Sequence, residues 1–302
     1  MDISLDYYSI SIIIVLIISP LIGSFLNVVI YRLPIMLEDM WRAECLEFIK
    51  EDKELQKALD VNKSEIKEIE KDKNINLAFP SSFCPSCDNK IKFYDNIPIL
   101  SYLILQGECR SCKTKIPFMY FLIEILTLLF SLIVVIKFGA SFKTIAALFL
   151  TWCLIAASGI DYKHYLLPDN IIIPVLWLGL LVNLNDTFIN IQLAVISACV
   201  GYLFFWLIAR AYILLTKKEG IGYGDFKLYA LFGAWIGLYM LPQIIIISSI
   251  LAIIFAFAAK IISKRNLLNN PIPYGPFIAF AGYIAVIFGE EINNWYINLF
   301  II

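Results

Sequence analysis

The sequence predicts an all-α protein that crosses a membrane several times and carries one sizeable polar loop between its first two helices. The chain has 302 residues, of which 60% are apolar and only 16% are charged, a composition typical of membrane proteins. The apolar residues gather in about eight segments, and roughly 20 such residues are enough to cross a hydrocarbon core of about 30 Å. One large polar stretch, residues 31–117, separates the first two segments.

The first apolar segment runs from Ser9 to Ile30, with acidic residues before it and Arg32 after it. Because basic residues flank membrane helices on the cytoplasmic side, this order predicts an outer N-terminus. Neither a positive start nor a small-residue cleavage site is clear, so the segment is expected to remain as an anchor. The other segments are expected at Met119–Ile136, Phe142–Ile160, Ile171–Leu184, Ile191–Leu215, Phe226–Met240, Gln243–Ile262 and Phe277–Phe288, with Ile292–Ile302 at the interface.

Counting crossings from an outer N-terminus places the end of the third segment and the start of the sixth on the cytoplasmic side. The same count places most basic loop residues there, as the positive-inside rule requires. These residues are Lys163, Lys217, Lys218, Lys227, Lys260, Lys264 and Arg265. Lys137 and Lys143 fall in a predicted outer loop and disagree with the rule.

The polar stretch contains two Cys-x-x-Cys sequences separated by 21 residues, with cysteines at Cys84, Cys87, Cys109 and Cys112. Each sequence forms a tight turn that aims two sulfurs at one point, and two such turns supply four thiolates for a tetrahedral zinc ion. A closed four-sulfur site leaves no open coordination position, so the expected zinc is structural. Two disulfides or redox chemistry are the alternatives.

Two other parts of the polar stretch carry weaker signals. Leu37–Asn76 is densely charged with mixed signs and predicts amphipathic helices with a solvated face. Phe93–Leu103 is apolar but too short to span a membrane. It is expected either to lie on the membrane surface or to pack against the zinc module.

The residue inventory argues against several classes of function. A net charge of −1 does not favour nucleic acid as the main partner. The sequence contains one histidine, His164, whereas an HExxH zinc site needs two. A serine protease triad would have to use that same histidine.

Two aspartates mark the ends of apolar runs, and ionisable residues at membrane depth are usually functional. Asp161 closes one run and Asp225 opens another, on the same predicted side. We expect their carboxyl groups to meet as a general acid–base pair that shares one proton, so one pKa should rise. Helix dipoles favour Asp161 as the acid and Asp225 as the base, but a coupled pair titrates as a unit and the roles stay open.

Helix capping is the competing interpretation for such aspartates. Asp225 stands where an N-cap of the following helix could lie. Asp169 follows Pro168 and is interpreted as the N-cap of the fourth helix.

Several motifs together resemble those of the type IV prepilin peptidases. They are Gly23–Pro34 (GSFLNVVIYRLP), the paired Cys-x-x-Cys, Tyr94–Tyr102 (YDNIPILSY), Ile160-Asp161 with Leu167–Asp169, Gly222–Leu228 (GYGDFKL) and Pro273–Phe277 (PYGPF). The resemblance covers nearly the whole chain. It implies a cytoplasmic membrane enzyme that cleaves the basic leader of prepilins or pseudopilins after a glycine, on the cytoplasmic side. It also implies methylation of the new N-terminal amine with S-adenosylmethionine.

By this resemblance the catalytic residues are Asp161 and Asp225, and the zinc ligands are the four cysteines. The expected organisation is a transmembrane helix at 1–30, a cytoplasmic zinc-binding loop domain at 31–117, and a seven-helix aspartyl protease core at 118–302. No residues are assigned to S-adenosylmethionine, because no glycine-rich nucleotide loop of the Rossmann type is present.

Three other classes of protein remain as rivals. An intramembrane aspartyl protease without methyltransferase activity would also use a Gly-x-Gly-Asp sequence. A transporter could use the carboxylates as a proton relay. A membrane scaffold would need no such pair.

Overall fold

The computed structural model describes residues 3–51, 75–218, 220, 222–263 and 272–300. Within these ranges the chain is helical, and its only β-type pairings are two isolated bridges. The all-α prediction is therefore confirmed. The chain divides into two compact units, residues 1–23 with 123–302, and residues 24–122.

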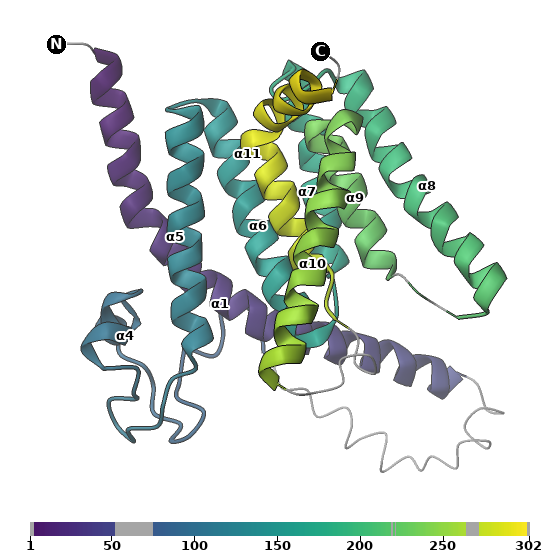
Figure 1. The fold of residues 1–302 in the computed structure, drawn as a ribbon. Helices are drawn as coiled ribbons and strands as arrows, with labels where there is room; N and C mark the ends of the chain where they lie inside the picture. Colours follow the sequence, from purple (N-terminus) through teal and green to yellow (C-terminus); the bar gives the residue numbers. More distant parts are fainter. Residues whose placement is uncertain (1–2, 52–74, 219, 221, 264–271, 301–302) are drawn as a thin grey trace. The chain divides into compact units, whose positions relative to one another are not determined.

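Each of the eight expected apolar segments corresponds to a helix of the described chain (Figure 1). Two of them extend beyond their helix and end in the short 3-10 helices η2 (Asn183–Asn185) and η3 (Leu238–Met240). Six helical stretches there are long and apolar enough to cross a membrane, and they show a multi-pass membrane protein. Two helices have only 14 residues each, which is about 21 Å at 1.5 Å per residue. The helices are α1 (Ile3–Glu51), α5 (Phe118–Phe138), α6 (Phe142–His164), α7 (Asp169–Val182), α8 (Ile191–Thr216), α9 (Tyr223–Ile236), α10 (Leu241–Ser263) and α11 (Gly275–Phe300).

Two boundaries differ from the expectation. The helix α1 continues past Ile30 to Glu51, because hydropathy detects only its apolar part while the charged residues that follow remain helical. The amphipathic helix expected within Leu37–Asn76 is thus the end of α1, and residues 52–74 lie outside the described ranges. The interfacial segment expected at Ile292–Ile302 does not form a separate helix either, because α11 continues to Phe300.

In the membrane unit, α9 is the central helix. Its residues from Leu228 to Ile236 are all buried, and α7, α8 and α11 each pack against it. The indole Nε1 of Trp235 donates a hydrogen bond of 2.9 Å to the carbonyl of Val175 on α7. The core of this unit therefore forms around one of its two 14-residue helices.

The ends of α7 and α9 meet at Asn183, a fully buried residue in the 3-10 turn η2 (Asn183–Asn185). Its Nδ2 donates to the carbonyls of Ala234 and Trp235 at 2.9 and 3.0 Å. Its Oδ1 accepts from the amide of Phe188 at 3.0 Å. Backbone groups must find protein partners where water is excluded, and one side chain satisfies several of them here.

The second unit contains the polar loop. Arg32 on α1 is buried and donates to the carbonyls of Asn76 and Pro80, at 2.9 and 2.6 Å. The amide of Asn27 donates to the carbonyl of Tyr120 at 2.9 Å, at the start of α5. Two short helices lie between these anchors, η1 (Phe93–Asn96) and α4 (Leu100–Ile104).

Candidate active site and metal centre

Asp161 lies in the last turn of α6 and is only 6% exposed. Its Oδ2 accepts a hydrogen bond of 3.0 Å from the amide of Gly275, the first residue of α11. The carboxyl group therefore lies at the positive end of the α11 dipole as well as at the end of its own helix. A bulkier residue than glycine does not fit, because a Cβ on Gly275 would lie 2.7 Å from Oδ2.

Asp225 is the third residue of α9, whose N-cap is Gly222. Its backbone amide bonds the Gly222 carbonyl at 3.1 Å, and its carboxyl group faces the Gly222 backbone. The N-cap residue makes no side-chain cap, so the capping interpretation of Asp225 is wrong. Asp225 instead places its charge in the first turn, where the helix dipole stabilises it.

Asp161 and Asp225 lie at the same end of the unit, each beside a glycine that Leu167 contacts. The helices α7 and α11 each pack against both α6 and α9 and connect them. Leu167, between α6 and α7, fills the space at this end of the unit. A Cβ on Gly224 would lie 2.8 Å from Leu167 Cβ, and one on Gly275 would lie 3.1 Å from Leu167 Cδ2.

A carboxyl pair of this kind has a defined chemical capacity. Two neighbouring carboxylates in a poorly solvated site cannot both be charged without a large cost, so they share one proton. The ionised member can accept a proton from water while the protonated member donates one. This is the chemistry by which a pair of aspartates hydrolyses a peptide bond.

The capping prediction for Asp169 is also wrong. The helix α7 begins at Asp169, but its N-cap is Pro168 and no side chain caps it. Both carboxylate oxygens of Asp169 accept instead from Lys227 Nζ, at 2.6 and 2.8 Å. The partner lies 58 residues away, so local sequence could not reveal it.

The four cysteines of the two Cys-x-x-Cys loops converge as predicted. Their sulfurs all lie within 4.8 Å of one another, and the Sγ atoms of Cys84 and Cys112 are 3.7 Å apart. A tetrahedral zinc with sulfur ligands at about 2.3 Å requires sulfur pairs at about 3.8 Å. The set therefore fits a four-coordinate metal ion and could bind one.

The protonation of these sulfurs is unequal before any ion binds. Hydrogen bonds with the side chain and backbone of Thr114 lower the pKa of Cys112 to about 6. The backbone of Asn89 lowers the pKa of Cys87, but burial and the neighbouring sulfurs outweigh it and raise that pKa to about 12. Metal binding would therefore release protons from the cluster.

The two cysteine loops have the same local form, and the second loop is also bonded to the helix η1. Isolated bridges pair Phe83 with Lys90 and Glu108 with Lys115, one in each loop. Arg110 reaches from the second loop to Asp95 in η1, and its Nε lies 2.9 Å from Oδ2. This hydrogen bond lowers the pKa of Asp95.

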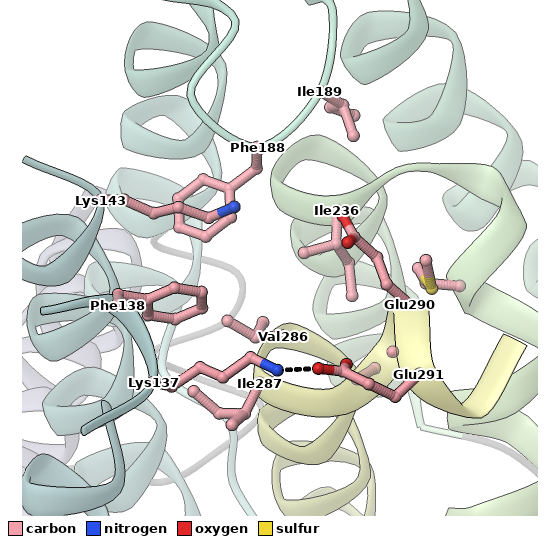
Figure 2. A pocket seen from close by; sticks show the side chains of 13 residues that line it. Lys137, Phe138, Lys143, Phe188, Ile189, Ile236, Val286, Ile287, Glu290 and Glu291 are labelled. Atoms are coloured by element: carbon pink, nitrogen blue, oxygen red, sulfur yellow. Dashed lines mark hydrogen bonds and ion pairs between the residues drawn. The ribbon is translucent and has the colours of Figure 1, made fainter. Parts of the chain in front are cut away.

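A cavity of about 90 Å³ lies at the other end of the membrane unit (Figure 2). Lys143, which lines it, precedes Asp161 by 18 residues of α6, or about 27 Å along the helix. Lys137 pairs there with Glu291, and the Lys143 ammonium lies over the rings of Phe138 and Phe188. Lys137 and Lys143, which disagree with the positive-inside rule, are thus bound by neighbouring side chains. The cavity is separate from the aspartates.

Two residues beside Asp161 and Asp225 were not assigned to the site from the sequence. Gly275 supplies the amide that binds Asp161, and Leu167 separates Gly224 from Gly275. The motif Pro273–Phe277 was already part of the resemblance. A glycine at the start of a helix next to a buried acid is the signal that could have identified Gly275.

Two family models match the chain. Residues 17–138 match the Bacterial Peptidase A24 N-terminal domain, and residues 148–257 match the Type IV leader peptidase family. No solved structure matches.

Curated relatives cover nearly the full length of the chain, and those compared share the name prepilin leader peptidase/N-methyltransferase. The relative from Aeromonas salmonicida (strain A449) is 44% identical over 93% of this chain and 91% of its own length. That from Aeromonas hydrophila is 44% identical over 94% and 92%, and that from Pseudomonas aeruginosa 42% identical over 92% and 90%. The resemblance seen in the motifs is thereby confirmed, and the chain belongs to the type IV leader peptidase family.

Proposed function

We propose that this protein cleaves the basic leader peptide of type IV prepilins or pseudopilins and then methylates the new N-terminal residue. The single observation that supports the cleavage activity is that Asp161 and Asp225 lie at the same end of the membrane unit, at the starts of α11 and α9. Such a pair is the minimum machinery for aspartyl proteolysis. The names of the relatives support both activities.

In the proposed cleavage, the ionised aspartate takes a proton from water as the water oxygen attacks the scissile carbonyl. The other aspartate donates its proton to the carbonyl oxygen. In the second step the carbon–nitrogen bond of the tetrahedral diol breaks. The leaving amine takes the proton that the first aspartate received from water, while a hydroxyl of the diol returns a proton to the second aspartate and becomes the carbonyl of the new acid. Each carboxyl group lies at a helix N-terminus, which stabilises its negative charge at either stage.

The resident cofactors follow from the same assignment. Cys84, Cys87, Cys109 and Cys112 would hold a structural zinc ion, which would tie the two loops together. S-adenosylmethionine would supply the methyl group to the new amine. Four sulfur ligands leave the zinc no open position, so the proteolytic steps depend on the aspartates alone.

The proposed organisation follows the predicted boundaries. It has a transmembrane helix at 1–30, a zinc-binding loop domain at 31–117, and a protease core at 118–302. The protein would reside in the cytoplasmic membrane with Asp161 and Asp225 facing the cytoplasm. The basic residues near that end, Lys163, Lys217, Lys218 and Lys227 among them, support this orientation.

The test is incubation of the purified protein with a prepilin and isotopically labelled S-adenosylmethionine. Mass analysis of the pilin reports leader loss and methyl gain separately. Cleavage without any methyl transfer would show that the protein is a protease only. If neither product forms, both proposed activities are wrong. The transporter and scaffold alternatives are not favoured, because the relatives are named as enzymes.

A further inference from the structure

The short helix α4 presents an apolar face that the described part of the protein does not cover. Leu100, Leu103 and Ile104 lie at positions i, i+3 and i+4, which places them on one side of the helix. They are 56%, 58% and 74% exposed. We call these three residues the α4 face.

The opposite side of α4 is attached to the start of a membrane helix. The ring of Tyr102 stacks on Phe121 of α5 with centroids 4.8 Å apart. Gly107 packs directly against the ring of Tyr102, since a Cβ at position 107 would lie 2.9 Å from it. Because Phe121 is the fourth residue of α5, α4 lies at the level where this helix begins.

That level corresponds to a membrane boundary. Phe118–Phe138 has a mean hydropathy of 2.6 and the length of a membrane span. Phe118, its first residue, is 59% exposed, and its ring lies 5.7 Å from that of Phe121. The helix α4 is therefore attached close to an exposed aromatic residue, at the start of a helix long and apolar enough to cross a membrane.

We propose that the α4 face inserts into the membrane interface and holds the four-cysteine module against the bilayer beside the start of α5. A short amphipathic helix with its apolar side outward is the form that interfacial segments take. Exposed apolar residues grouped in this way mark an interaction surface rather than an ordinary soluble one. This role is independent of the proposed proteolysis and methylation.

The direct test places a genetically encoded fluorescent amino acid at Leu103 of the full-length protein in lipid nanodiscs. Nitroxide-labelled phospholipids should quench it several-fold, while iodide in the buffer should have little effect. The matched control carries the same fluorophore at Asn89, which is exposed in the first cysteine loop. There iodide should quench several-fold more strongly than at Leu103.

Two results would overturn the proposal. Equal iodide quenching at both positions without lipid quenching would show that the face is in water. Shielding of position 103 from both quenchers would show that protein covers the face, as a bound substrate or a second copy would do.

A second measurement does not depend on the fluorophore. In Leu103→Ser with Ile104→Ser, hydrogen exchange of the backbone amides from 100 to 106 in nanodiscs should become several-fold faster. Ile91→Ser, an exposed apolar residue of the first cysteine loop, should leave that exchange unchanged. Unaltered metal content in both variants shows that the module is folded, and unchanged exchange in the double variant would contradict insertion.

Discussion

The Nζ atom of Lys227 lies within 2.8 Å of both carboxylate oxygens of Asp169, and this ion pair joins the first turns of α9 and α7. Lys227 follows Asp225 by two residues. Leu167 precedes Asp169 by two residues and packs against Gly224. The pair and the packing together fix the segment that carries Asp225.

Lys227→Asp and Asp169→Lys should each lower kcat for leader cleavage by about 10- to 100-fold, because small displacements of a catalytic group are costly. Combining the two changes reverses the pair and should restore much of the lost rate. The pair is partly exposed, so Asp169→Asn should change the unfolding free energy by at most about 1 kcal/mol. The measurements are single-turnover cleavage and thermal unfolding. A double variant no better than the singles would count against a positioning role.

Asp161→Asn and Asp225→Asn should each reduce leader cleavage by about 10²- to 10⁴-fold, since each removes one partner of the acid–base pair. Methylation of a pilin supplied without its leader should persist, because the variants leave that reaction untouched. The wild-type rate should follow a bell-shaped pH profile, since one aspartate must be ionised and the other protonated. Retained cleavage with a flat profile in either variant contradicts the assignment.

Gly275→Ala should impair cleavage more than Gly222→Ala. A Cβ at 275 would lie 2.7 Å from Asp161 Oδ2, and it must displace the carboxyl group or the start of α11. Crowding of this kind typically costs about 1–3 kcal/mol, which corresponds to a loss of about 5- to 160-fold if it acts on the transition state. A Cβ at 222 would meet Asp225 Oδ2 at an ordinary 3.6 Å. Comparing kcat/KM for the two variants tests this order, and equal losses would speak against it.

One zinc ion per chain is expected by elemental analysis of the purified protein. Serine in place of any one of the four clustered cysteines should greatly reduce this content, whereas Cys45→Ser, outside the cluster, should not. Because only thiolates bind zinc strongly, metal affinity should fall as the pH falls. Full metal content in Cys84→Ser, the most buried of the four, would show that the ion binds elsewhere.

The sequence alone predicted the features that depend on local pattern. Hydropathy located every apolar helix, because about 20 consecutive apolar residues have few other structures available. The spacing of Cys84, Cys87, Cys109 and Cys112 predicted their convergence, since each Cys-x-x-Cys turn brings two sulfurs together without help from the rest of the fold.

The features that depend on distant contacts were not predictable in the same way. Asp169 was interpreted as a cap because its partner Lys227 comes from another helix. The amide of Gly275 binds Asp161 across 114 residues, and no periodicity encodes that pairing. The helical extent of α1 was underestimated because apolar length and helical length are different properties.

Asn183 has a consequence for the energetics of the host membrane. The proposed hydrolysis has to admit water to Asp161 and Asp225, yet a continuous file of water through the bundle would conduct protons and dissipate the gradient. Asn183 bonds to Ala234, Trp235 and Phe188, so these backbone groups at the far ends of α7 and α9 need no water as a partner. Bonding of this kind within the protein opposes a continuous water path across the bilayer.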